Sequence, residues 1–365
     1  MKLKRIKTIQ IAFWVVMGAL TAAALAAVVR LDPAVVGRVL AAMGRIPPAR
    51  WAVIAAGVVV FYMSDWLRFY ALLRLFDVRI SPLFGLQLTA ASYFAASLTP
   101  WQELHLPAMV LLMMSIGIAP AVATAVTVAK SLYTVFWICL SACLSMALTP
   151  GLAFPPSAAR WLPLYLAPVV IMVVGLVLVS IFAERIHAAA LRMRAGATRP
   201  AHWRRKLVAA LDHSASALAA IGRSRRPWHW LCHAAALGMI ASYGFVGQQL
   251  AAGLGFGIGY GQAFTVFSNG LMAAYLAPIP GSYGVGEGAT AWLLDSRLSP
   301  EALAAGILVR VLCWHIVFLP GAVILLRAIR RHGYATWTRL VWGETDPAEA
   351  GTGGGTGAGV ERPAR

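Results

Sequence analysis

Charged residues are scarce in this chain. Asp, Glu, Lys and Arg make up 12% of the 365 residues, whereas 60% of the residues are hydrophobic. A water-soluble domain of this length cannot bury so large an apolar fraction. The composition therefore excludes a soluble globular protein and predicts an all-α polytopic integral membrane protein of the cell membrane.

Acidic residues are the scarcer charges, with 13 Asp and Glu against 31 Lys and Arg and a net charge of +18. In a soluble protein this excess would suggest nucleic acid as a partner. Here the basic residues sit in short segments that flank apolar runs. They therefore indicate membrane topology and contact with anionic lipid headgroups, and no nucleic acid.

Reactive and metal-binding patterns are missing as well. The four cysteines lie in apolar runs, and Cys139 and Cys143 share a helix face that no histidine or carboxylate joins. They are typical of small buried hydrophobic residues rather than of a disulfide or a metal site. The chain has no Ser-His-Asp pattern, no metal-ligand spacing and no P-loop. We expect no enzyme activity, no cofactor and no metal.

Long apolar runs are abundant. They predict six full membrane spans, at about 9–29, 50–73, 120–148, 161–183, 229–252 and 301–328. The first run is about 20 residues long, which exceeds the roughly 7 to 15 residues of a signal-peptide core, so we interpret it as an uncleaved span. Residues 33–46 have the pattern of an interfacial amphipathic helix.

Two further apolar stretches, about 81–118 and 261–296, are broken by "LTPWQELHLP" and "LAPIPGSYGVGEGA". The segment from Gly284 to Leu294 would measure about 17 Å as a helix, too short for a hydrocarbon core of about 30 Å. The run 104–117 is similarly short. Irregular backbone at membrane depth must face protein or a water-filled cavity. We therefore predict two re-entrant helical hairpins.

The two broken stretches resemble each other. Each has a proline break, a glutamate, a short apolar helix, and then a proline that opens a full span with a base ten residues later. The opening prolines are Pro120 and Pro300, and the bases are Lys130 and Arg310. Such pairing is typical of an inverted repeat. We predict a transmembrane domain over 1–342, with a first repeat unit at about 50–148 and a second at about 229–328.

A basic segment, 184–228, links the two units and carries ten Lys or Arg against two acids. Apolar residues recur in it at helical spacing, at Trp203, Leu207, Val208, Leu211, Leu218 and Ile221. This pattern favours an interfacial helix on an anionic leaflet, and a solvated loop is the alternative. The Gly-rich residues 343–365 should be a disordered tail.

The basic residues also predict orientation. Lys2, Lys4, Arg5 and Lys7, the 184–228 segment, and Arg327, Arg330 and Arg331 place both termini in the cytoplasm. Four arginines between residues 30 and 50 run against this scheme. With six spans, the two hairpins would open from opposite sides of the membrane.

The charges inside apolar stretches are the candidate functional residues. A charge at the bilayer centre costs roughly 2.5 to 3.5 kcal/mol, so such residues usually pair and mark a substrate or ion path. Four of them could neutralise one another across the repeat axis. The predicted cavity residues are Glu103, Glu287, Lys130, Arg310, Pro100, Trp101, Pro278, Pro280, Gly281, Tyr283 and Gly286. The two glutamates could instead only cap their half-helices.

Three further residues are secondary candidates. Asp65 and Arg68 are spaced i, i+3 and can pair on one helix face, although Arg68 could also snorkel to the membrane surface. His315 is more typical of a buried hydrogen-bonding group than of a proton relay.

The motif "APIPGSYGVGEGA" resembles the "PIPGGxGxxE" motif of the lysylphosphatidylglycerol synthase membrane-domain family. "LTPWQEL" is similar to the earlier "TPGxxGE" motif of that family, and "GILVRVLCWHIVFLPG" to its Arg-containing final span. The resemblance covers about residues 10–330 and implies movement of lipids between leaflets. The soluble aminoacyltransferase domain of some members is not expected here, so lysyl transfer is not implied.

The sequence thus favours a translocase for a phospholipid or lipid-linked substrate. Glu103 and Glu287 would recognise a cationic headgroup or carry protons, and Lys130 and Arg310 would balance them and meet phosphate. One alternative is an enzyme or accessory subunit in polyprenyl, hopanoid or glycolipid modification. Another is a scaffold that binds partners through the basic segment. A homo-oligomer is compatible with each of these.

Overall fold

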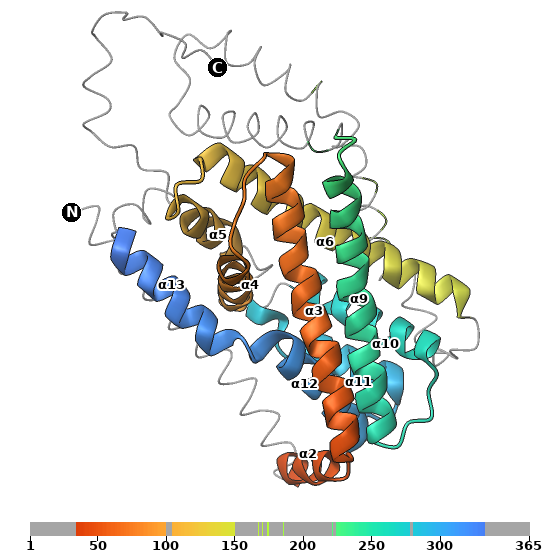
Figure 1. The fold of residues 1–365 in the computed structure, drawn as a ribbon. Coiled ribbons are helices and arrows are strands. Elements are labelled where there is room, and N and C mark those ends of the chain that lie inside the picture. The colour runs from red at the N-terminus through yellow and green to blue at the C-terminus, as the bar shows by residue number, and fades with distance from the viewer. Residues whose placement is uncertain are drawn as a thin grey trace, which may run out of the picture.

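The computed structural model describes residues 34–99, 104–149, 224–277 and 280–332, with a few single residues between 167 and 221. Every element in these ranges is a helix (Figure 1). The predicted all-α fold is confirmed for this part of the chain.

Prolines begin most of the long helices. The first half of the chain forms α2 (Ala34–Gly44), α3 (Pro48–Leu75), α4 (Pro82–Ala96), α5 (His105–Met114) and α6 (Pro120–Leu148). The second half forms α9 (Pro227–Gly253), α10 (Tyr260–Leu276), η2 (Pro280–Ser282), α11 (Val285–Leu294), α12 (Pro300–Arg310), η3 (Val311–His315) and α13 (Phe318–His332). A proline suits the first helical turn because its missing N–H has no partner there anyway.

Four helices are long and apolar enough to cross a membrane. They are Pro48–Leu75, Val122–Leu148, Pro227–Gly253 and Pro300–Arg331. They agree with four of the six predicted spans. The predicted span 9–29 and the tail 343–365 lie outside the described residues, as does the span 161–183 apart from three single residues. The interfacial helix predicted in 184–228 also lies outside them apart from its last apolar residue.

Each broken stretch is divided into two shorter helices. α4 and α10 have 15 and 17 residues, and α5 and α11 have 10 each. At 1.5 Å per residue a ten-residue helix measures about 15 Å, half of the hydrocarbon core. α5 and α11 therefore cannot cross a membrane, as the length of the sequence segments predicts.

Helices α3 and α9 run antiparallel, side by side, through the middle of the structure (Figure 1). Around this pair, α4 packs on α5 and α5 on α6, while α10 packs on α11 and α11 on α12. Contacts of α4 with α13 and of α10 with α6 also join the two halves. α2 packs against α12.

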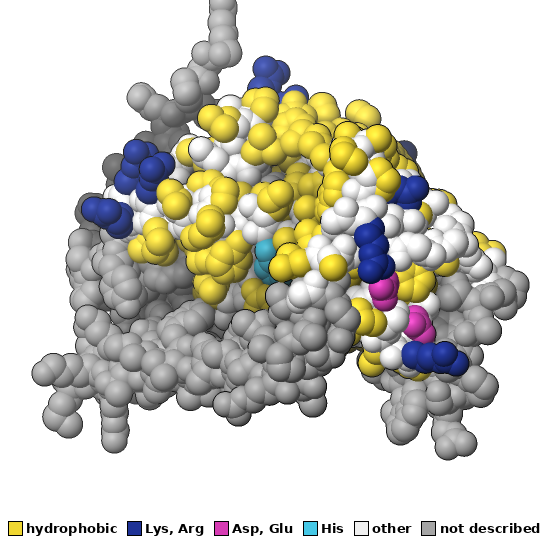
Figure 2. Space-filling view, turned by 90° about the horizontal axis from the view of Figure 1, so that it is seen from below, with side chains coloured by type: hydrophobic (Ala, Val, Ile, Leu, Met, Phe, Trp, Pro, Cys, Tyr) yellow, Lys and Arg dark blue, Asp and Glu magenta, His cyan; other side chains and the backbone are white. Residues whose placement is uncertain are grey.

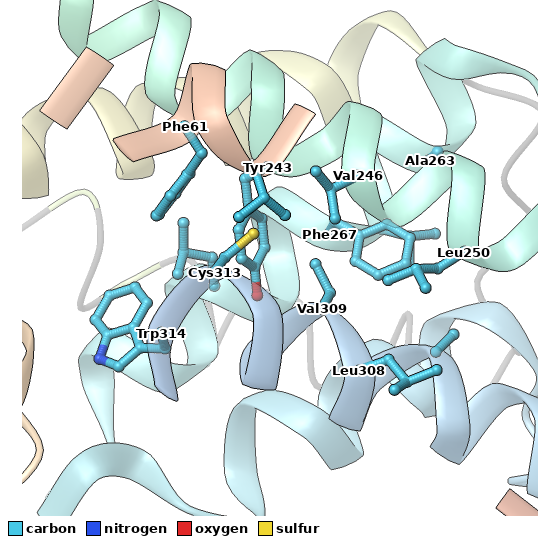
Figure 3. Close-up of a cluster of buried hydrophobic side chains, with 14 of the residues drawn as sticks. Phe61, Tyr243, Val246, Leu250, Ala263, Phe267, Leu308, Val309, Cys313 and Trp314 are labelled. Carbon is cyan, nitrogen blue, oxygen red and sulfur yellow. The ribbon is translucent and has the colours of Figure 1, made fainter. Parts of the chain in front are cut away.

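The larger hydrophobic core lies where α3, α9, α10 and α12 meet. In Figure 3, Phe61, Tyr243 and Phe267 lie in one cluster with Val309, Cys313 and Trp314. Cys139, Cys232 and Cys313 are buried, and all four cysteines are free thiols, which agrees with their expected packing role. Hydrophobic side chains also cover much of the described face in Figure 2, while Lys and Arg side chains lie at its upper and left edges and beside the acidic side chains on the right. So much exposed apolar surface suits a protein embedded in lipid.

Candidate functional site

A buried cluster of three charges lies between α3 and α6. Asp65 is 0% exposed and Arg68 1% exposed, and the two side chains form an ion pair one turn apart on α3. The predicted pairing is confirmed, and the alternative of a snorkelling Arg68 is wrong because its guanidinium is buried in the protein.

Lys130 completes this cluster from α6. Its Nζ lies 3.0 Å from Oδ2 of Asp65 and 4.3 Å from the ring centre of Phe69, which adds a cation–π contact. Arg68 Nη1 donates a hydrogen bond of 2.9 Å to Thr134 Oγ1, and that hydroxyl donates to the carbonyl of Lys130. One acid therefore holds two bases, and the cluster carries one net positive charge.

This cluster lines a cavity of about 260 Å³, which we call the central cavity. Its other walls come from α4, α5, α9, α10 and η3, with Tyr93, His105, Met239, Tyr275 and Trp314 among them. Aromatic rings form one side, since Trp314 lies 4.8 Å from Tyr93 and 6.0 Å from Tyr275, measured between ring centres. The lining of the central cavity thus combines a cationic cluster with an aromatic one.

A second cluster pairs Glu287 of α11 with Arg310 of α12. Arg310 is 2% exposed, and its Nε lies 3.8 Å from Oε1 of Glu287. Its Nη2 donates a hydrogen bond of 2.7 Å to the carbonyl of Gly281 in the proline–glycine break. Arg310 therefore holds the irregular backbone of the break, whose carbonyl has no helical partner.

Glu287 also caps its half-helix. Its Oε2 accepts a hydrogen bond of 3.0 Å from the backbone N–H of Gly284, the residue before α11. Gly284 has a φ of 83°, a conformation that favours glycine. The capping role that the sequence offered as the alternative for Glu287 is thus present. Neither Glu287 nor Arg310 is among the residues that line the central cavity.

Close packing fixes the position of Glu287 relative to α12. A Cβ on Gly306 would lie 2.5 Å from the carbonyl oxygen of Glu287, so only glycine allows this approach. Gly286 also packs tightly, because a Cβ there would lie 2.8 Å from that of Ala274 on α10. The half-helix α11 is therefore clamped between α10 and α12.

Trp314 connects the two clusters. It lines the central cavity, and its ring centre lies 4.2 Å from Cζ of Arg310. It belongs to η3, a π-helix that follows Arg310 directly. The wide turn of a π-helix frees a backbone carbonyl, and that of Leu312 accepts a hydrogen bond of 3.1 Å from Tyr62 of α3.

The predicted neutralisation across the repeat axis is wrong for the described charges. Lys130 pairs with Asp65 inside the first unit, and Arg310 pairs with Glu287 inside the second. Pro280 and Gly281 form the short helix η2 of the break. Tyr283 stacks on His315 at 5.3 Å between ring centres, and neither is among the residues that line the central cavity.

The predicted site residues Pro100, Trp101, Glu103 and Pro278 lie outside the described residues. Sequence reasoning missed the aromatic wall and the hydroxyls of Ser131 and Thr134. The spacing of these hydroxyls from Lys130, one and four residues, was a usable signal, because it places them on or beside the face of that base.

Long apolar helices around a buried charged cavity define a multi-pass membrane protein whose site lies between its helices. The sequence model of the family described as "Lysylphosphatidylglycerol synthase TM region" matches residues 11–321. The chain therefore belongs to this family, as its motifs indicated, and the family associates it with a lipid-related function in a membrane. No curated protein matches the chain.

Proposed function

We propose that this protein translocates a phospholipid or lipid-linked headgroup between the leaflets of a bacterial-type inner membrane. The observation that carries the proposal is the central cavity, in which Arg68 and Lys130 face only one acid, Asp65, among its described lining residues. A buried site with one excess positive charge favours an anionic group. Every phospholipid carries such a group in its phosphate.

The size of the central cavity supports a headgroup rather than a whole lipid. Pockets that enclose drug-sized ligands hold roughly 300 to 1,000 Å³. A cavity of about 260 Å³ is smaller, so it suits a phosphate and its substituent while the acyl chains stay in the surrounding lipid. Such a passage would lower the cost of carrying a charged headgroup across the hydrocarbon core.

The depth of the charges fits this passage. Lys130 lies ten residues after Pro120, the first residue of α6. This corresponds to about 15 Å along the helix, half of the hydrocarbon thickness. A cation at that depth can meet a headgroup that enters from either leaflet.

The proposal includes two re-entrant hairpins, α4–α5 and α10–α11, related as an inverted repeat. The packing supports it, because α4 contacts α13 in the way that α10 contacts α6. Lys130 and Arg310 also match, since each follows its opening proline by ten residues and lies over an aromatic ring. In this scheme both termini are cytoplasmic and the hairpins open from opposite sides.

The roles of the charged residues follow from their contacts. Lys130 and Arg68 would bind the phosphate, and Asp65 would hold both in place. Glu287 and Arg310 would hold the second break in shape, which replaces the headgroup recognition expected for Glu287. The role of Glu103 stays as predicted from the sequence, contact with a cationic headgroup or a proton.

The test uses Lys130→Gln in proteoliposomes that contain a fluorescent phospholipid, with the rate of leaflet exchange as the measurement. This change leaves a neutral Asp65–Arg68 pair, so the protein should fold. We expect exchange to slow about tenfold or more, because the loss of one charged contact is worth roughly 1.5 to 3 kcal/mol. Arg226→Gln is the matched control, because Arg226 pairs with Asp77 on the surface. This variant should exchange lipid at the wild-type rate.

A folded Lys130→Gln protein that exchanges lipid at the wild-type rate would overturn the role of the central cavity. Mass spectrometry of the extracted lipids separates the alternatives. A covalently changed lipid would favour an enzyme or its subunit, and loss of function only on deletion of residues 184–228 would favour a scaffold.

A further inference from the structure

A second cavity, of about 330 Å³, lies between α4, α5 and α13. We call it the α13 cavity. None of its described lining residues belongs to the central cavity. Figure 1 shows α13 on the outer side of the helices, away from the central α3–α9 pair. The α13 cavity is therefore separate from the proposed translocation site.

The polar lining of the α13 cavity is cationic. Arg327 and Arg331 both contribute to it, joined by the amide of Gln87, and no Asp or Glu is among its described lining residues. The two arginines are four residues apart, so they share one face of α13. Neither forms an ion pair with any residue that the structure describes, which leaves both guanidinium groups available to an anion.

Two guanidinium groups on one helix face suit a phosphate. Each presents planar N–H donors that match phosphate oxygens, and two of them can bind one phosphodiester from two sides. Gln87 of α4 adds an amide that can donate a further hydrogen bond. The chemistry of this end of the cavity therefore selects an anionic phosphate group.

The other end of the α13 cavity is apolar, with Phe84, Leu112 and Ile324 in its lining. The neighbouring outer face of α13 exposes Leu319 at 76% and Leu326 at 57%, which indicates that lipid surrounds this helix. A free inorganic phosphate would gain nothing from these apolar walls. A glycerophospholipid would use both ends, because its phosphate and its acyl chain are adjacent.

We propose that the α13 cavity binds one anionic glycerophospholipid, with its phosphate on Arg327 and Arg331 and an acyl chain against Phe84, Leu112 and Ile324. This site is additional to the translocation path. Because α13 packs on both α4 and α5, the bound lipid would bridge three helices.

The structure provides a matched control for this site. Arg330 lies between the two arginines on the same helix but does not line the α13 cavity. A general attraction of basic residues to anionic membranes would involve all three arginines alike. Binding at a specific site would require Arg327 and Arg331 and would not require Arg330.

The experiment titrates the full chain in neutral detergent micelles with phosphatidylglycerol and counts bound lipid by native mass spectrometry. At the α13 cavity, wild type should bind phosphatidylglycerol more tightly than phosphatidylcholine, because the choline cation offsets the charge of the phosphate. The double variant Arg327→Gln, Arg331→Gln should bind it about tenfold or more weakly, as expected for the loss of charged hydrogen bonds. Arg330→Gln should bind it like wild type.

Ile116→Trp tests the apolar end without a change of charge. Ile116 lines the cavity and is 48% exposed, so a larger side chain can be accommodated without refolding the core while it narrows the site. This variant should weaken phosphatidylglycerol binding.

Three results would overturn the proposal. Equal loss in Arg330→Gln would indicate a non-specific basic surface. In a parallel titration, binding of inorganic phosphate as tight as that of phosphatidylglycerol would indicate a site for free anions. Unchanged binding in the double variant would place the lipid elsewhere. Because the readout is binding and the central cavity is untouched, these results are independent of the translocation test with Lys130→Gln.

Discussion

The two halves of the molecule bury charge in different ways. In the first half, Asp65 holds Arg68 and Lys130, and this cluster lines a cavity. In the second half, Arg310 contacts Glu287 and the carbonyl of Gly281, outside that cavity. Equivalent positions in the two sequence units thus serve different ends. The Asp65–Arg68–Lys130 cluster lines the central cavity, and the Glu287–Arg310 cluster stabilises the backbone of the proline–glycine break.

The largest effect should come from Asp65→Asn. This change leaves Arg68 and Lys130 as two buried cations without a counter-charge, and a broken buried pair costs about 3 to 5 kcal/mol. Thermal unfolding in detergent would show a large loss of stability. Adding Lys130→Met should restore part of it, because only one cation then remains. A loss that the second change does not relieve would mean that the charges are not coupled.

An intermediate effect is expected for Arg310→Gln. The variant loses the hydrogen bond to Gly281 and the contact with Glu287, and a hydrogen bond from a charged group is worth about 1.5 to 3 kcal/mol. Thermal unfolding should show this loss, while lipid exchange should fall less than in Lys130→Gln. If exchange fell as steeply as in Lys130→Gln, the division of roles between the two clusters would be wrong.

The smallest effect is expected for Glu287→Gln. The amide oxygen can still accept the N–H of Gly284, so the cap of α11 persists and only the 3.8 Å ionic contact is lost. Arg310 keeps its hydrogen bond to the carbonyl of Gly281, so the loss should be smaller than in Arg310→Gln. We expect about 1 kcal/mol of destabilisation, and about 1 kcal/mol more for Glu287→Ala, which also removes the cap. Unfolding of the two variants side by side measures the difference. A much larger loss in the Gln variant would mean that the negative charge itself is needed.

Much of the fold was predictable because membrane helices carry strong local signals. Length and hydropathy gave the four described spans, and proline positions gave the starts of α6 and α12. The half-helices α5 and α11 followed from length alone. The π-helix η3 was not foreseen, since nothing in the apolar run "VLCWH" separates it from an α-helix.

The candidate site was only partly predictable. The spacing of Asp65 and Arg68 reveals their pairing, because i, i+3 neighbours share a helix face. The partner of Lys130 could not be read in the same way, since Asp65 lies on another helix and the contact depends on how α3 and α6 rotate against each other. The aromatic wall of Tyr93, Tyr275 and Trp314 likewise comes from three separate elements.

The Asp65–Lys130 ion pair and the Arg68–Thr134 hydrogen bond limit how α3 and α6 can move. These polar contacts connect α3 to α6, so the two helices cannot separate without breaking interactions between buried charged groups. The aromatic lining of the central cavity is instead held through ring contacts of Trp314 with Tyr93 and Tyr275, each worth about 0.5 to 1.5 kcal/mol. A bound group that needs more room in the central cavity should therefore displace the aromatic rings before it separates the charged cluster.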